Sequence, residues 1–265
     1  MELADRHVVI TGAARGIGRA LAFRFAAERP RALVVADLDE PEAEAVAREI
    51  GAVAAQIDVR RESDIRALID GAQGRDGPID LFCSNAGVPG PGGGPETSDP
   101  DWQATWEANV MAHVWAARAL LPEMVARGEG YLLNTASAAG LLTQVSALPY
   151  SVTKHAAVAL AEWIAINYGD AGIKVSCLCP QAVQTAMLDA ALEEPIGAAA
   201  LRAGGILSPE EVAETVVAGI REERFLILPH PQVAQYMAYK ASDPDAWLQR
   251  MRSFVREARS EDSPL

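Results

Sequence analysis

The sequence is poor in cysteine, histidine and aromatic residues. Of its 265 residues, 3 are cysteines, 4 are histidines and 6% are aromatic. Cys83, Cys177 and Cys179 stand in apolar runs without the spacing of a disulfide framework, so they indicate buried thiols in a reducing compartment. The histidines are scattered, and none falls in a paired metal-ligand motif. We therefore expect neither a disulfide-rich secreted fold nor a metal site.

Positive charge is scarce, and so are long apolar runs. The formal net charge of −13 at pH 7 argues against nucleic acid and anionic membrane surfaces, both of which select for basic patches. No apolar run approaches the roughly 18 residues of a membrane-spanning helix. Glu2 and Asp5 precede a first strand at about residue 7, which leaves no room for a signal peptide. A cytoplasmic protein without nucleic-acid or membrane partners is expected.

The length and the 50% hydrophobic content are enough for one large core. Strand and helix patterns alternate along the chain, which is typical of a parallel sheet with helices on both faces. We expect a single domain over residues 1–265, an α/β fold with a doubly wound, Rossmann-like parallel sheet of about seven strands. The expected strands are 8–10, 32–36, 53–57, 79–84, 131–135, 174–178 and 225–228. The expected helices are 16–28, 40–50, 62–73, 101–127, 150–168 and 209–221.

Two stretches interrupt this alternation: residues 88–100, which are rich in Gly and Pro and are expected to form a loop, and residues 186–207. Residues 186–207 are apolar and would follow the carboxyl end of a parallel strand, where segments that cover a substrate are found. We expect a substrate lid there, with a surface excursion packed on its own core as the alternative. Residues 229–265 form a C-terminal helical tail in which Trp247, Met251 and Phe254 recur at helical spacing. This tail is expected to pack on the domain or on a neighbouring subunit rather than to act in the chemistry.

The segment HVVITGAARGIG, residues 7–18, runs from an apolar strand through a turn with three glycines into a helix. A dinucleotide-binding turn needs glycine for the tight bend, for close approach to the pyrophosphate and for packing of the helix on the strand. With Thr11 in front, the spacing of Gly12, Gly16 and Gly18 resembles the nucleotide-binding turn of the short-chain dehydrogenase/reductase family. For this motif alone, an ordinary turn between a strand and a helix is the alternative.

The choice of cofactor depends on two charged residues. Asp37 ends the second expected strand, where a carboxylate accepts hydrogen bonds from the ribose of adenosine and repels a 2′-phosphate. Arg15 argues the other way, because a cation beside the glycine turn could pair with that phosphate. A like-charge contact at ~4 Å costs on the order of 4 kcal/mol at a surface-like dielectric, so Asp37 is taken as decisive. NAD is the expected cofactor, with NADP as the alternative.

The resemblance implies further cofactor contacts. Asp58 resembles the family residue that accepts from the adenine amino group, SNAG resembles the family's Asn-Asn-Ala-Gly, and PQAVQT resembles its Pro-Gly-x-Val-x-Thr. Thr185 would then bind the nicotinamide carboxamide, and Val183 would lie against the ring. The cofactor residues expected are Gly12, Arg15, Gly16, Ile17, Gly18, Asp37, Asp58, Val59, Asn85, Ala86, Gly87, Tyr150, Lys154, Pro180, Val183 and Thr185.

The motif YSVTK places Tyr150 and Lys154 four residues apart, on one face of a helix. A general acid/base works best near the operating pH, so a fixed ammonium is expected to lower the pKa of the Tyr150 phenol from its ordinary value near 10. Ser137 precedes Tyr150 by 13 residues and can hold a substrate oxygen as its charge develops. Asn109 matches the family asparagine that supports a water leading from Lys154. These four resemble the catalytic tetrad of the family.

Together these motifs imply an NAD(H)-dependent oxidoreductase that interconverts a neutral, lipophilic secondary alcohol and its ketone. The residues expected to line the substrate site are Ser137, Gln144, Gln181, Met187 and Leu188. An NADP(H)-dependent ketone reductase and a catalytically idle NAD(H)-binding regulatory protein are the alternatives. A nucleotide-sugar epimerase also uses a Tyr-x3-Lys pair, but a longer chain is expected for it.

The sequence departs from the family pattern at two places. Gln181 replaces the usual glycine, so its side chain is expected to narrow the substrate site. The chain also lacks the Val-Asp-Gly-Gly ending of many tetrameric members and has LPHP instead. This puts the usual tetramer contact in doubt, and we expect a homo-oligomer, either a dimer or a tetramer.

Overall fold

A computed structural model describes residues 1–188 and 205–261 of the chain. Seven strands form one sheet in the order β3-β2-β1-β4-β5-β6-β9, and every neighbouring pair is parallel. The strands are β1 (His7–Thr11), β2 (Ala32–Asp37), β3 (Val53–Gln56), β4 (Leu81–Ser84), β5 (Gly130–Thr135), β6 (Ile173–Leu178) and β9 (Leu226–Ile227). The strand order reverses between β1 and β4, which is the point where α/β sheets bind their ligands. The expected doubly wound sheet of about seven strands is confirmed.

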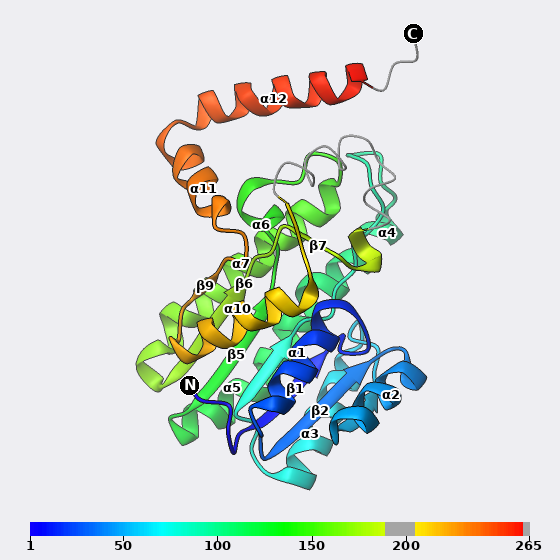
Figure 1. Ribbon diagram of the computed structural model, residues 1–265, viewed down its shortest axis with the longest axis vertical. Helices are drawn as coiled ribbons and strands as arrows, with labels where there is room; N and C mark the ends of the chain where they lie inside the picture. The colour runs from blue at the N-terminus through cyan, green and yellow to red at the C-terminus, as the bar shows by residue number, and fades with distance from the viewer. Residues whose placement is uncertain (189–204, 262–265) are drawn as a thin grey trace.

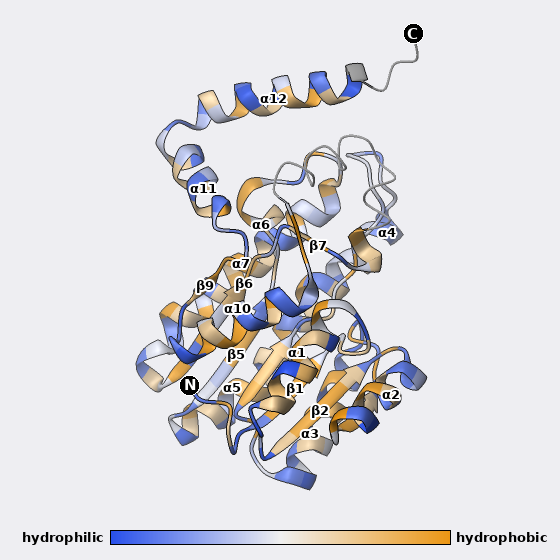
Figure 2. Ribbon diagram, viewed as in Figure 1, coloured by the Kyte–Doolittle hydropathy of each residue, from blue (hydrophilic) through white to orange (hydrophobic). Residues whose placement is uncertain are grey.

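Helices cover both faces of the sheet (Figure 1). One face packs under α1 (Gly16–Ala27), α2 (Glu40–Ile50) and α10 (Pro209–Arg221), and the other under α3 (Glu62–Asp76), α5 (Ala112–Arg127) and α7 (Leu148–Tyr168). Successive side chains of a strand point to opposite faces, so Val8 and Ile10 of β1 enter the first core while Val9 enters the second. Both faces are therefore apolar, as Figure 2 shows by the orange strands between helices with blue outer faces.

The helix expected over 101–127 consists of three segments. α4 (Asp99–Trp106) is capped at its N-terminus by Ser98, whose side chain accepts a hydrogen bond from the Asp101 backbone amide. A π-helical turn, η1 (Glu107–Met111), then separates α4 from α5. Such turns interrupt α-helices mainly at functional sites, and this one carries Asn109. The sequence periodicity predicted a helix here but not its interruption.

Two short strands outside the main sheet lie at the ends of the expected lid. β7 (Ala182–Val183) pairs in parallel with β8 (Ile206–Leu207). Of the lid expected over 186–207, residues 189–204 lie outside the described residues. The remaining short elements are α6 (Ala139–Leu142) and a 3₁₀ turn, η2 (Gly169–Ala171).

The C-terminal tail forms an arm of two helices, α11 (Gln232–Ser242) and α12 (Pro244–Glu261). The arm crosses the carboxyl end of the sheet, and α12 lies at the top of Figure 1, far from the N-terminus. The Lys240 amine on α11 donates to the Leu141 carbonyl of α6 at 2.7 Å. Tyr239 and Trp247 meet edge to face, with ring centres 6.0 Å apart, and join α11 to α12. No helix of the described residues is long and apolar enough to cross a membrane.

Candidate active site

One large cavity opens at the carboxyl ends of the strands, with a volume of about 1520 Å³. It exceeds the roughly 300–1,000 Å³ of ordinary ligand sites, so it has room for a dinucleotide and a second molecule. All the site residues expected from the sequence line it except Asn109. They are Gly12, Arg15, Gly16, Ile17, Gly18, Asp37, Asp58, Val59, Asn85, Ala86, Gly87, Ser137, Gln144, Tyr150, Lys154, Pro180, Gln181, Val183, Thr185, Met187 and Leu188.

The glycine turn keeps one wall of the cavity free of side chains. Gly12 has a φ of +64°, and a Cβ there would lie 2.7 Å from the Ala86 Cα. A Cβ on Gly18 would lie 2.0 Å from the Gly12 carbonyl oxygen. The N-terminus of α1, which opens beside this turn, has neither a side-chain cap nor an acidic residue in its first turn. The turn therefore fits the pyrophosphate of a dinucleotide.

Asp37 stands at the end of β2 with its carboxylate held by the backbone. Its two oxygens accept from the Ala14 amide at 3.0 Å and from the Asp39 amide at 3.1 Å. Arg15 forms an ion pair with Asp39. The cation that could attract a 2′-phosphate is therefore already neutralised by a neighbouring carboxylate, while the carboxylate that would repel the phosphate is fixed.

Asp58 and Asn85 are engaged by other protein groups. Arg60 binds both oxygens of the Asp58 carboxylate, at 3.0 and 2.7 Å, and its guanidinium lowers the pKa of that carboxyl. The Asn85 amide donates to the carbonyls of Thr11 and Gly12, both at 3.1 Å. Asn85 therefore ties the glycine turn to the end of β4, a positioning role that the sequence motif does not distinguish from a direct cofactor contact.

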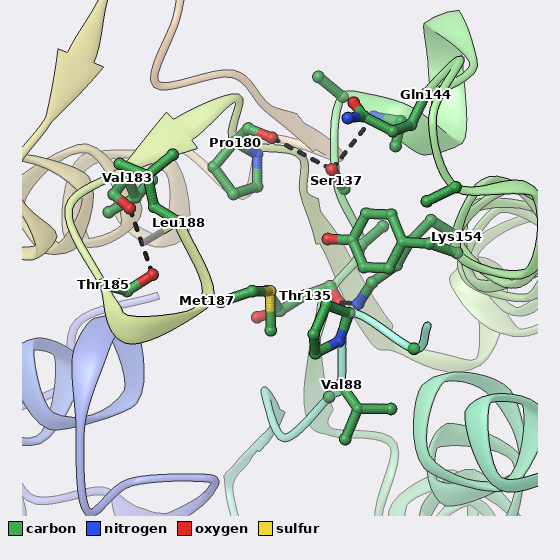
Figure 3. Close-up of a pocket in the computed structure, with 18 of the residues that line it drawn as sticks. Val88, Thr135, Ser137, Gln144, Lys154, Pro180, Val183, Thr185, Met187 and Leu188 are labelled. Atoms are coloured by element: carbon green, nitrogen blue, oxygen red, sulfur yellow. Dashed lines mark hydrogen bonds between the residues drawn. The ribbon is translucent and has the colours of Figure 1, made fainter. Parts of the chain in front are cut away.

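Lys154 is buried, with 3% of its surface exposed. Its amine donates to the Thr135 carbonyl at 3.0 Å (Figure 3). The same amine lies 5.6 Å from the centre of the Tyr150 ring. Burial lowers the pKa of Lys154 to about 8, because the charged form loses its hydration. The two residues lie on one face of α7, as their spacing predicted.

The pKa of Tyr150 corrects the expectation from the sequence. Burial raises this pKa, whereas a hydrogen bond with Ser137 acts in the opposite direction. Loss of hydration disfavours the phenolate, and the amine of Lys154 lies over the ring with its hydrogen bond given to Thr135. The charge of the lysine is visible in the sequence, whereas the burial of the phenol is a property of the folded chain.

Ser137 is buried beside the short helix α6. Its hydroxyl lies 3.4 Å from the Pro180 carbonyl and accepts from the Ala139 amide at 3.1 Å (Figure 3). Gln144 lines the same part of the cavity, and its side-chain amide donates to the Ser146 hydroxyl at 3.1 Å. These contacts fix a hydroxyl at the place where a substrate oxygen is expected.

Gln181 does not stand free in the substrate site. Its side-chain oxygen accepts from the Gln232 amide of α11 at 3.2 Å, and its backbone amide donates to the His230 ring at 3.1 Å. Gln181 still lines the cavity. The residue that replaces the usual glycine therefore also connects the substrate side of the cavity to the start of the C-terminal arm.

Asn109 lies behind the cavity wall. Its side chain pairs with the Val88 backbone, accepting at 2.9 Å and donating at 2.9 Å, and it also donates to the Thr153 hydroxyl at 3.2 Å. A Cβ on Gly87 would lie 3.0 Å from the Asn109 oxygen and 3.3 Å from the Lys154 amine. Asn109 thus holds the wall next to the buried lysine.

His113 and a set of residues on the C-terminal arm lie near the site and were not predicted from the sequence. His113 follows Asn109 by one helical turn. It is buried, and its ring nitrogens make no hydrogen bond of ordinary geometry. Burial and the nearby Lys154 lower its pKa to about 3, against a smaller effect of Asn134. In the sequence, His113 stands four residues after Asn109, and this spacing places the two side chains on one face of a helix.

The other set comes from the C-terminal arm. These residues line the cavity together with the motif residues, and they are Tyr236, Tyr239, Trp247, Arg250, Met251 and Phe254. The apolar spacing of Trp247, Met251 and Phe254 was visible in the sequence, and α11 packs on the domain through Lys240 and Gln232. The sequence did not indicate that the arm also lines the cavity, where Arg250 adds a cation to the wall.

Among residues 1–188 and 205–261, no group of His, Cys, Asp and Glu side chains could hold a metal ion. A parallel sheet with a glycine turn at its switch point, and Ser137, Tyr150 and Lys154 in the same cavity, defines an α/β oxidoreductase that binds a nicotinamide cofactor. The chain belongs to the short chain dehydrogenase family, whose model matches residues 6–195.

Two curated relatives of the chain are dehydrogenases by name. The chain is 36% identical over 237 residues to 1-deoxy-11-beta-hydroxypentalenate dehydrogenase of Streptomyces exfoliatus, covering 86% of this chain and 84% of the relative. It is 32% identical over 259 residues to estradiol 17-beta-dehydrogenase 11 of Mus musculus, covering 94% and 84%.

Solved structures agree with this family membership. A short-chain dehydrogenase/reductase from Burkholderia phymatum in complex with NAD superposes with a TM-score of 0.83 at 32% identity, covering 93% of this chain and 96% of that one. A 3-ketoacyl-(acyl-carrier-protein) reductase from Brucella melitensis complexed with NADH gives a TM-score of 0.75 at 28% identity, covering 85% and 96%.

Proposed function

We propose that this protein is an NAD(H)-dependent oxidoreductase that interconverts a neutral, lipophilic secondary alcohol and its ketone, with Tyr150 as general acid/base. The observation that carries the proposal is the cavity itself, in which Ser137, Tyr150 and Lys154 face the same space as the glycine turn and Asp37. The cofactor residues and the proton-transfer group are thus close enough to act on one bound alcohol.

The preference for NAD is supported by charges at the adenosine end. Asp37 offers a fixed carboxylate, and Arg15 is paired with Asp39. The Burkholderia phymatum relative was solved in complex with NAD. In the proposed arrangement, the glycine turn holds the pyrophosphate, Asp37 holds the ribose, and Val183 and Thr185 hold the nicotinamide end.

In the proposed mechanism, NAD supplies the acceptor for the hydride of the carbinol carbon when it is bound. Ser137 holds the substrate oxygen through its hydroxyl, and the Tyr150 phenolate takes the hydroxyl proton. A charged Lys154 beside the phenol would favour the phenolate, whereas burial favours the neutral phenol. In ketone reduction the neutral Tyr150 donates its proton to the carbonyl oxygen.

A lipophilic substrate is supported by the lining of the cavity on the side of Tyr150. The side chains there are largely apolar, and they include Ala138, Ala139, Leu142, Met187 and Leu188. Of the two curated relatives named above, one is a dehydrogenase of estradiol, a neutral alcohol, and the other of a hydroxypentalenate, a carboxylate. The first supports the neutral substrate class, and the second does not. The net charge of −13 argues against acidic carrier-protein thioesters as substrates.

The expected homo-oligomer is supported by one face of α7. Trp163 and Ile166 are 55% and 73% exposed, and Val152, on the same side of this helix, is 40% exposed. Large apolar side chains gathered on one helix face are typical of a subunit contact. Light scattering after size-exclusion chromatography tests this part of the proposal, and a monomer at micromolar concentration would contradict it.

The enzymatic proposal is tested by mixing the protein with NAD and a panel of neutral secondary alcohols, cyclic and aliphatic, and following the absorbance of NADH. Carboxylated and phosphorylated alcohols form the comparison set. Turnover of the neutral set is expected. Preference for the charged set would refute the neutral substrate class, and NAD binding without turnover of any alcohol would favour the catalytically idle alternative.

A further inference from the structure

The C-terminal arm forms part of the cavity wall. It lies outside the residues matched to the family model, which end at residue 195. Six residues of α11 and α12 line the same cavity as Tyr150. In Figure 1 the arm crosses the carboxyl end of the sheet and ends beyond it. The arm therefore faces the space in which the part of a substrate remote from the reacting hydroxyl must lie.

The arm is anchored to the substrate side of the cavity at two places. The Lys240 amine donates to the Leu141 carbonyl of α6, and Gln232 at the start of α11 donates to Gln181. Trp247 of α12 is 8% exposed and packs against Tyr239 of α11. The two hydrogen bonds hold α11, and the ring contact of Trp247 with Tyr239 connects α12 to α11. The position of α12 beside the cavity of its own chain therefore depends on Trp247.

α12 has two different faces. Trp247, Met251 and Phe254 follow the spacing i, i+4 and i+7, and all three line the cavity. Leu248, on another side of the same helix, is 56% exposed and does not line the cavity. The helix thus turns one apolar stripe toward the cavity.

Met251 and Phe254 are half-buried by the protein. Their remaining apolar surface borders the cavity, and covering such surface is favourable by roughly 25 cal/mol per Å². An apolar group of the substrate is the occupant that this position favours, because Met251 and Phe254 line the same cavity as Ser137 and Tyr150, which in the proposed function hold the reacting oxygen. A second copy of the chain is the competing occupant, and it is tested below.

We propose that α12 determines substrate specificity: Met251 and Phe254, held in place through Trp247, bind the end of the substrate remote from the reacting hydroxyl. The enzyme then prefers secondary alcohols with a large apolar body over small ones. This inference rests on the proposed function for its kinetic test, and it deepens that function by giving the size of the substrate.

The test uses the full chain and the variants Phe254→Ala and Met251→Ala, with Leu248→Ala as the matched control on α12. The kcat/KM for cyclododecanol and for cyclopentanol is measured with saturating NAD. For the large alcohol we expect a decrease of at least about tenfold in Phe254→Ala and a smaller one in Met251→Ala. For cyclopentanol, and for both alcohols in Leu248→Ala, values within about twofold of the unmodified protein are expected.

Three outcomes would overturn the inference. One is an equal loss for both alcohols in Phe254→Ala, which indicates a structural effect of α12. Another is the same loss in Leu248→Ala. The third is a change of subunit number in Phe254→Ala by light scattering, which indicates that a second copy covers the stripe.

A binding measurement separates this inference from the proposed function. Cyclododecanone is titrated calorimetrically into the protein with NADH, for the unmodified chain, Phe254→Ala and Leu248→Ala. If no alcohol is oxidised, the proposed function fails. The role of α12 is still supported if Phe254→Ala binds cyclododecanone more weakly and Leu248→Ala binds it like the unmodified chain. Equal binding by all three proteins, or no binding by any of them, overturns that role.

Discussion

The amine of Lys154 lies 5.6 Å from the centre of the Tyr150 ring and gives its hydrogen bond to a backbone carbonyl of β5. This relationship fixes a cation beside the phenol without a direct bond between the two groups. A charge at that place can act on the phenol only through its field. The pKa of Tyr150 is raised by burial, and the hydrogen bond with Ser137 acts in the opposite direction.

Replacing Tyr150 by Phe removes the proton carrier and leaves the ring that packs in the cavity wall. We expect kcat for alcohol oxidation to fall by at least about 100-fold, which is the low end of the usual effect of a general acid/base. NADH binding, followed by its fluorescence, is expected to remain. Substantial residual turnover would reject Tyr150 as the proton-transfer group.

The two directions of the reaction are expected to respond oppositely to pH. Because burial raises the pKa of Tyr150, the neutral phenol prevails near pH 7. Alcohol oxidation needs the phenolate, so its kcat/KM increases with pH, while ketone reduction decreases once the phenol loses its proton. Steady-state pH profiles in both directions test this, and parallel profiles would contradict it.

Cofactor choice is expected to depend on Asp37. The variant Asp37→Ser removes the charge that opposes a 2′-phosphate, and the kcat/KM ratio of NADPH to NADH should increase at least about tenfold. In the companion variant Asp39→Asn, Arg15 loses its ion-pair partner and becomes available to the phosphate, so a smaller increase is expected. Equal efficiency of NADH and NADPH in the unmodified protein would overturn the assignment of NAD.

The glycine turn offers a stability test with an internal control. An alanine Cβ at Gly18 would lie 2.0 Å from the Gly12 carbonyl oxygen, so Gly18→Ala should destabilise the fold by about 1 to 3 kcal/mol and weaken cofactor binding. Gly74 lies in α3, and a Cβ there has no atom within 4 Å. Gly74→Ala should therefore stabilise the fold by about 0.5 to 1 kcal/mol. Chemical denaturation measures both changes.

His113 is expected to make the fold sensitive to acid. Its pKa in the folded chain is lowered to about 3 from the ordinary 6.5. Between pH 3 and pH 6.5, the unfolded chain therefore binds a proton at His113 that the folded chain does not bind. The free energy of unfolding should then decrease as the pH falls from 6.5 toward 3. In His113→Leu the loss between pH 7 and pH 5 should be smaller than in the unmodified protein. An identical loss in both would show that His113 does not contribute.

Much of the fold follows from local patterns. The β-branched run at Val8 to Ile10 indicates a strand covered on both faces, and the glycine spacing beside it predicts the turn at the switch point. The interruption at Asn109 could not be predicted in this way, because the side chain of Asn109 bonds to Val88 and Thr153, which are remote in sequence.

The candidate site could be predicted only in part, for a related reason. Spacing identified Ser137, Tyr150 and Lys154, but the pKa of Tyr150 depends on how much water the surrounding fold removes, which no motif records. Likewise, the apolar spacing in α12 showed that Phe254 faces a partner. It did not show that this face lines the cavity of the same chain, because periodicity identifies the apolar face of a helix but not where the helix lies in the fold.

The pairing of β7 with β8 joins residues 182–183 to residues 206–207 in register. Ala182 and Val183 therefore lie beside Ile206 and Leu207, and the pairing itself does not fix how many residues connect the two strands. Lengthening such a connection costs little, because the closure entropy grows with the logarithm of its length. Insertions or deletions between these two strands are therefore expected to leave the main sheet, and with it the glycine turn, undisturbed.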